Sequence, residues 1–155
     1  MTYIVDTNVI VVANEREPDQ HPPNCILECV RRLQAIKDEG RLALDSTGAI
    51  FAEYSRHASL SGEPGPGDAF LRWVFNNQWN PEYCDRIEIT LLEDGGYREF
   101  PSDSRLEKFD HGDMKFVAVA SAHAGKPPIP NAVDSDWEQF AHVLAEHGIK
   151  VVGLC

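Results

Sequence analysis

The sequence lacks any long apolar run, which excludes a membrane-spanning helix. Such a helix needs about 20 consecutive, predominantly apolar residues, and every apolar segment in these 155 residues is much shorter. No basic stretch precedes the first apolar segment, so we expect no secretory signal and predict a cytoplasmic protein without a membrane partner.

Positive charge is also scarce. The chain has 14 lysines and arginines against 25 aspartates and glutamates, a formal net charge of −11. Proteins that wrap nucleic acid without regard to sequence depend on many Lys and Arg contacts to phosphates, so the composition excludes that mode of binding. A nuclease is not excluded, because a carboxylate cluster becomes much less negative once it holds divalent cations.

Cysteine is sparse, and the sequence has no internal repeats or low-complexity tracts. The four cysteines are Cys25, Cys29, Cys84 and Cys155, and no two of them form a CxxC pair. A structural zinc site or a disulfide framework is therefore disfavoured, and we expect reduced thiols, as in a cytoplasm. A chain of this length forms one domain, residues 1–155, whose core needs neither metal nor disulfide.

Short apolar strands alternate with segments of helical periodicity. The strands are predicted at residues 3–5, 41–44, 86–92, 127–133 and 149–154. The helices are predicted at residues 22–40, 47–58, 68–79, 113–125 and 136–148. This alternation, with strands buried on both faces, predicts an α/β fold: a three-layer α/β/α sandwich around a mostly parallel central sheet.

Two helix starts carry residues suited to capping. Ser46 or Thr47 is expected to cap the helix after the second strand, and Asp68 the helix that follows "SGEPGPG". That glycine-rich stretch follows a helix and contains prolines, so it does not have the context of a phosphate-binding loop.

Acidic side chains recur where a functional edge of the sheet is expected. Asp6 ends the first strand, Asp134 and Asp136 follow the strand at 127–133, and Asp113 begins the next-to-last helix. Glu53 lies about two turns into the helix after the second strand. In parallel sheets the carboxyl ends of the strands form the sites, and crowded carboxylates need a cation to remain ionised. Oxygen-rich clusters of this kind favour Mg²⁺ or Mn²⁺.

Each acidic residue also has a purely structural interpretation. Taken alone, Asp6 fits a strand end that caps the following turn. In "DHGD", Asp110 competes with Asp113, one as a helix cap and the other as a first-turn acid; the apolar pattern that follows favours Asp113. Asp136 is well placed to cap the last helix, which favours Asp134 for the metal.

Four segments, in order along nearly the whole chain, resemble the PIN-domain nucleases. They are "YIVDTNVIV", "STGAIFAEYSRH", "DMKFVAVASA" and "NAVDSDW". The resemblance implies a PIN-like fold and metal-dependent phosphodiester cleavage, commonly of single-stranded RNA. Many small bacterial members are VapC-type toxins of toxin–antitoxin pairs.

The resemblance also implies a set of site residues. The catalytic and metal-binding acids would be Asp6, Glu53, Asp113 and Asp134, with Asp136 as an additional metal ligand. The cofactor would be Mg²⁺ or Mn²⁺. Substrate contacts would come from Thr7, Asn8 and Lys115.

Several partners and functions remain open at this stage. The predicted substrate is single-stranded RNA, with DNA as the alternative. The resemblance adds a protein antitoxin, and the apolar helices around residues 26–36 and 70–79 allow a homodimer. One competing function is a non-catalytic PIN-like module that binds RNA or protein. Another is a phosphatase or phosphotransfer domain with Asp6 as nucleophile, which Asn8 disfavours because such sites commonly have an Asp there.

Overall fold

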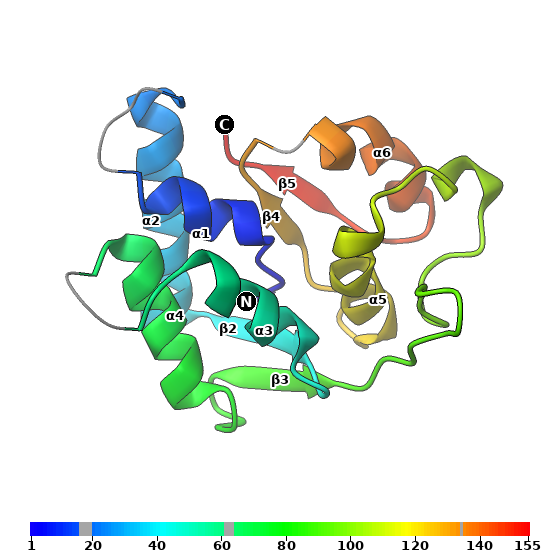
Figure 1. Cartoon of the computed structure of the whole chain (residues 1–155), viewed down its shortest axis with the longest axis horizontal. Coiled ribbons are helices and arrows are strands. Elements are labelled where there is room, and N and C mark those ends of the chain that lie inside the picture. Colours follow the sequence, from blue (N-terminus) through cyan, green and yellow to red (C-terminus); the bar gives the residue numbers. More distant parts are fainter. Residues whose placement is uncertain (16–19, 61–63, 134) are drawn as a thin grey trace.

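The computed structural model describes residues 1–15, 20–60, 64–133 and 135–155 (Figure 1). Its strands are β1 Thr2–Tyr3, β2 Arg41–Asp45, β3 Cys84–Ile87, β4 Ile129–Asn131 and β5 Val151–Gly153. Its α-helices are α1 Thr7–Ala13, α2 Pro23–Glu39, α3 Ala49–His57, α4 Pro66–Asn77, α5 Met114–Ala122 and α6 Ser135–Glu146. Two 3₁₀ turns, η1 Ser104–Leu106 and η2 His111–Asp113, precede α5. The predicted mixed α/β class is confirmed.

The strands form two small parallel sheets, β1-β2-β3 and β4-β5. Two backbone hydrogen bonds join them just beyond β1: the Ile4 amide donates to the Pro128 carbonyl at 3.0 Å, and the Asp6 amide to that of Pro130 at 3.3 Å. The spatial order of the strands is therefore β3-β2-β1-β4-β5. From β1 the chain adds β2 and β3 on one side and then β4 and β5 on the other, so the switch point of the strand order lies between β1 and β4. Parallel α/β sheets open a binding crevice at such a reversal.

The predicted strand at 86–92 is wrong beyond residue 87. β3 spans Cys84–Ile87 because it pairs in register with β2, and β2 ends at Asp45 opposite Ile87. Past that point the chain loses its partner strand, and Leu91 forms only an isolated antiparallel bridge with Tyr97.

Helix α1 was not predicted from the sequence. Its residues, TNVIVVA, are rich in β-branched side chains, which have low helix propensity. Five of its seven residues are buried, and α1 packs against α2, α3 and α4. Burial of this helix among its neighbours therefore outweighs its local propensity.

The caps differ from those predicted. Gly48 occupies the N-cap position of α3, in place of Ser46 or Thr47, and the Asp45 carboxylate accepts hydrogen bonds from the amides of Ala49 and Ile50, both at 2.8 Å. Helix α4 begins at Pro66, before Asp68, and the Asp68 carboxylate accepts from the Gly65 amide at 2.9 Å. Asp68 therefore still accepts a hydrogen bond at the start of α4, but it occupies the third helical position instead of the N-cap position.

Helix α5 lies in the core. Every residue from Met114 to Ala120 is buried, and the fully buried aromatic rings of Phe109, Phe116 and Trp137 pack edge to face around it. Among the described helices, none has the length and apolar content needed to cross a bilayer.

A disulfide joins Cys25 in α2 to Cys155 at the end of the sequence, 130 positions apart. The expectation that all thiols are reduced was therefore wrong for this pair, since sequence spacing gives no sign that the two residues meet. Cys29 and Cys84 are buried free thiols. Burial, reinforced by the carboxylates of Glu15 and Glu28, raises the pKa of Cys29 to about 12.

Breaking this disulfide should destabilise the fold. Closing so long a loop restricts the unfolded chain, and removing such a bond costs about 2–5 kcal/mol. Cys155 is exposed, so Cys155→Ser tests the bond with little change in packing. We expect urea unfolding under oxidising conditions to show this loss, and reductant to bring the wild type to the level of the variant. Equal stability of the two proteins without reductant would contradict this prediction.

Candidate metal centre

Asp6 lies at the reversal point of the strand order. It is 3% exposed and occupies the N-cap position of α1, where its carboxylate accepts a hydrogen bond from the Asn8 amide at 3.4 Å. The capping interpretation of Asp6 is therefore confirmed. Its backbone amide is bound to Pro130, next to the end of β4, so the same residue also lies at the edge where a site was predicted.

Asn8 ties the start of α1 to the end of β4. Its side-chain amide donates to the Asn131 side-chain oxygen at 2.8 Å, and its own side-chain oxygen accepts from the Ala132 amide at 2.9 Å. The Asn131 carbonyl in turn accepts from the Leu154 amide at 2.9 Å, beyond β5. In this structure the side-chain amide and oxygen of Asn8 both bind the end of β4. They are not directed to solvent, as those of a substrate contact would be.

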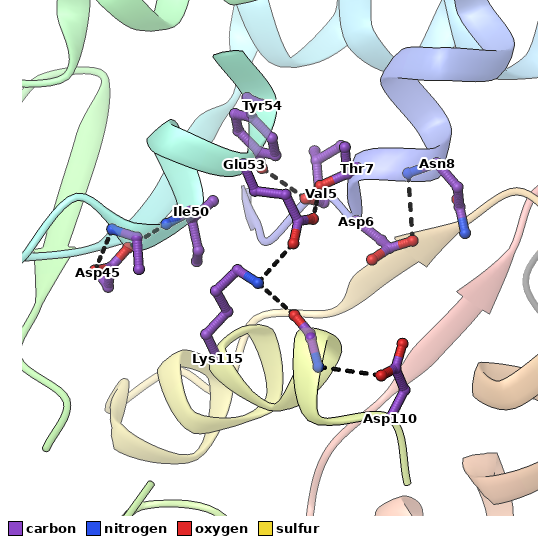
Figure 2. A network of polar contacts seen from close by, with 12 residues as sticks. Val5, Asp6, Thr7, Asn8, Asp45, Ile50, Glu53, Tyr54, Asp110 and Lys115 are labelled. Carbon is purple, nitrogen blue, oxygen red and sulfur yellow. Dashed lines mark hydrogen bonds and ion pairs between the residues drawn. The ribbon is translucent and has the colours of Figure 1, made fainter. Parts of the chain in front are cut away.

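Glu53 is held by two protein donors (Figure 2). One carboxylate oxygen accepts from the Lys115 ammonium at 2.6 Å, and the other accepts from the Thr7 hydroxyl. Lys115 also donates to the Gly112 carbonyl, and its side chain is only 10% exposed. The predicted phosphate contacts Thr7 and Lys115 thus meet at Glu53, and Lys115 is a buried side chain rather than a solvated one.

The carboxylates of Asp110, Asp113 and Asp136 form a separate cluster. One oxygen of each lies within 4.8 Å of the others. Asp113 is buried, Asp136 is partly buried, and Asp110 is exposed. Ligand oxygens on opposite sides of a Mg²⁺ ion lie about 4.2 Å apart. An all-oxygen donor set is the kind that hard divalent cations take, and exposed acidic groups also come this close together without an ion.

The sequence left two choices open, Asp110 against Asp113 and Asp134 against Asp136, and this cluster bears on both. Asp110 and Asp113 come together rather than competing: Asp110 caps the short turn η2, accepting from the Gly112 amide at 3.2 Å, and Asp113 begins α5. Asp136 lies in the first turn of α6 and joins them. Asp134 lies outside the described residues.

Asp6 and Glu53 do not belong to that carboxylate cluster, but they lie near the same region. In Figure 2 the side chains of Asp6, Glu53, Lys115 and Asp110 project toward the space between the end of β1, helix α3 and the start of α5. Figure 2 therefore shows Asp6 and Glu53 near Asp110, the exposed member of the carboxylate cluster.

Two polar residues of this edge were missed. Asn131 interrupts the apolar segment "PIPNAV", which was the available signal for a polar residue at the end of β4. Tyr54 donates its hydroxyl to the Val5 carbonyl at 2.6 Å. Complete burial, followed by the nearby carboxylates of Asp6 and Glu53, raises the pKa of Tyr54 well above its usual value. The tyrosine therefore serves as a neutral hydrogen-bond donor.

Comparisons with protein-family models, with curated proteins and with solved structures give no match for this chain.

Replacing Asn8 by aspartate should disrupt this edge. A carboxylate cannot donate to the Asn131 oxygen, so one hydrogen bond becomes a repulsive contact, at a cost of about 1–3 kcal/mol. We expect urea unfolding to show this loss for Asn8→Asp. The matched control, Asn24→Asp on the exposed start of α2, should not lower stability. If Asn8→Asp were as stable as the wild type, the Asn8 side chain would not be what holds the start of α1 to the end of β4.

Proposed function

We propose that this protein is a divalent-metal-dependent phosphodiesterase with a PIN-like three-layer fold, acting as an endoribonuclease on single strands. The observation that carries the proposal is the cluster of Asp110, Asp113 and Asp136, and Figure 2 shows Asp110 in the same region as Asp6. The resemblance of four sequence segments to PIN-domain nucleases supports the proposal, and Asp134, one of the acids it implies, lies outside the described residues.

The proposed cation ligands are the carboxylates of Asp113, Asp110 and Asp136, with Asp6 as a further acid. Asp134, which the resemblance also implies as a ligand, lies outside the described residues. When bound, Mg²⁺ or Mn²⁺ lowers the pKa of a water molecule and offsets charge on a phosphate. The surrounding chain fixes the positions of these acids. The Asn8 side chain and the Asp6 amide connect the segment after β1 to β4, and Asp113 lies at the start of the buried helix α5.

The proposed reaction is hydrolysis by in-line attack. The oxygen of a water molecule bonds to phosphorus while the bond from phosphorus to the 3′ oxygen breaks. The leaving 3′ oxygen takes up a proton, and the attacking water loses one to solvent or to an unligated carboxylate. The products are a 5′-phosphate end and a 3′-hydroxyl end.

The charge of the chain restricts the proposed substrate. The net charge is −11, so few Lys and Arg side chains are available to bind phosphates along a duplex. A short contact with a single strand is therefore favoured. RNA is the proposed substrate, and DNA is tested alongside it. A toxin role with a protein antitoxin, and a homodimer, belong to the same proposal. The cytoplasmic location stays a prediction from the sequence, and the Cys25–Cys155 disulfide is a feature that disfavours it.

The direct test of this function is cleavage of single-stranded RNA with Mg²⁺ or Mn²⁺. We expect Asp6→Asn and Asp113→Asn to lose about 100-fold or more in kcat, because each removes a charge that the reaction requires. Asp38→Asn, an exposed change near the end of α2, is the matched control. A parallel assay with DNA of the same sequence tests the choice of substrate. Equal cleavage by all four proteins would indicate a contaminating nuclease and exclude the proposal.

Metal binding provides an independent test that does not depend on substrate. In calorimetric titration with Mn²⁺, we expect Asp113→Asn to weaken binding about tenfold or more, and Asp110→Asn and Asp136→Asn to weaken it in the same direction. Asp38→Asn should bind as the wild type does. A wild-type protein that binds no Mn²⁺ would instead support the non-catalytic module.

A further inference from the structure

Three sulfur atoms meet where helix α2 faces the segment after β5. Cys25 and Cys29 lie one turn apart on the buried face of α2, and Cys155 reaches them from beyond β5 (Figure 1). The three sulfurs all lie within 4.8 Å of one another. Of the two groups of potential metal ligands among the described residues, this is the one built from sulfur.

The disulfide uses two of these sulfurs and leaves Cys29 as a third. The bond joins Cys25 to Cys155, while Cys29 is a free thiol with no exposed surface. Helical spacing places Cys29 beside Cys25, but only the tertiary structure brings it to Cys155 as well. A third sulfur adds nothing to a disulfide, whereas a zinc site takes three or four protein ligands.

The redox state decides which chemistry this group has. Disulfides persist in oxidising compartments, and where thiols are kept reduced a group of cysteines more often binds metal or takes part in catalysis. In the cytoplasm predicted from the sequence, the Cys25–Cys155 bond would be open. Cys155 is exposed, so a dithiol reductant can reach the bond.

The spacing of the three sulfurs suits tetrahedral ligation. Sulfur ligands about 2.3 Å from Zn²⁺ lie about 3.8 Å from one another, which is within the 4.8 Å that the three sulfurs already satisfy. Cys25 and Cys29 are held in place by α2, whereas Cys155 is exposed and lies beyond β5. The adjustment from bonded sulfurs to metal ligands therefore falls on Cys155.

A buried carboxylate oxygen near this group has no donor. Glu15 Oε2 is buried without a hydrogen-bond partner among the described residues, and Glu15 Oε1 contacts the His21 ring. Glu15 is close enough to Cys29 for its charge to act on the thiol. Buried negative charge needs a counter-charge or a donor. A cation held by the sulfurs, with a water molecule in its fourth position, offers both.

We propose that Cys25, Cys29 and Cys155 form a thiolate site for Zn²⁺ when the disulfide is reduced. Thiolate ligands select Zn²⁺, whereas Mg²⁺ and Mn²⁺ take oxygen ligands. In either redox state α2 is cross-linked to the segment after β5, by the disulfide or by the ion. The site uses none of the residues of the proposed phosphodiesterase and does not depend on that function.

The exchange between the two states balances as follows. A dithiol supplies two electrons and two protons to the Cys25–Cys155 bond, which opens to two thiols, and the dithiol becomes a disulfide. Zn²⁺ then forms three bonds to sulfur, and the three thiol protons pass to solvent.

The first experiment is metal titration of the reduced full chain. The protein is reduced with a dithiol, freed of it, and titrated with Zn²⁺ by calorimetry and with Co²⁺ by absorption spectroscopy. Excess Mg²⁺ is present so that carboxylates do not compete. We expect one ion per chain, with the charge-transfer band of sulfur bound to Co²⁺, and no such band in the oxidised protein. Reduced wild type without this band would overturn the inference.

The second experiment separates the metal site from the disulfide. Cys29→Ala keeps both sulfurs of the bond, so it should still form the disulfide on oxidation. When reduced, we expect it to bind Zn²⁺ about 100-fold or more weakly. The matched control is Cys84→Ala, at a buried free thiol elsewhere in the fold, and it should bind as the wild type does. Equal affinity of Cys29→Ala and the wild type would overturn the inference.

A variant at an exposed position covers the case in which Cys29→Ala does not fold. Reduced Cys155→Ser should lose the sulfur-to-Co²⁺ band, because it removes one of the three ligands. Thermal unfolding without metal checks that each variant is folded. A folded Cys155→Ser that keeps the wild-type band and affinity would exclude Cys155 as a ligand and overturn the site.

Urea unfolding of the reduced protein tests the cross-link itself. We expect Zn²⁺ to raise the urea midpoint of the reduced wild type toward that of the oxidised protein, because the ion closes the same loop. Reduced Cys29→Ala should show no such rise. Zn²⁺ that binds without raising the midpoint of the reduced wild type would show that the ion does not replace the disulfide.

Discussion

The repulsion between carboxylates gathered at one edge of the strands is the constraint on which the rest of the structure depends. Asp6 and Asp45 are buried at the ends of their strands, and Asp113 is buried at the start of α5. Each buried negative charge needs donors or a cation. Asp45 obtains its donors from the start of α3, and Asp6 accepts from the start of α1. Capping hydrogen bonds thus stabilise part of the buried charge.

Glu53 meets the same constraint with side chains. A hydroxyl and an ammonium, from α1 and α5, converge on its two oxygens. Asp110, Asp113 and Asp136 each bring one carboxylate oxygen within 4.8 Å of the others. The charge of Glu53 is thus balanced by donors of the chain itself, and the proposed function adds a cation at the three aspartates.

The framework that positions these acids consists of backbone hydrogen bonds and side-chain amide hydrogen bonds between β4 and the segment that follows β1. The hydrogen bonds of Asp6 to Pro130, of Asn8 to Asn131 and of Leu154 to Asn131 connect β1, β4 and the segment after β5. The disulfide of Cys25 with Cys155 then fixes that last segment to α2. Residues at both ends of the sequence are therefore required to position one edge of the sheet.

The sequence by itself determined the α/β class, most element positions and the presence of acids at strand ends and helix starts. These follow from local signals: periodicity, strand ends and short polar residues within apolar runs. It failed for α1, for the end of β3 and for the Cys25–Cys155 bond, because burial, strand pairing and chain closure depend on residues far apart. Tertiary structure alone decided that Asp110 joins Asp113 and Asp136, and that Lys115 faces Glu53. The physical reason is that the balance of charge depends on distances in space, which sequence spacing does not specify.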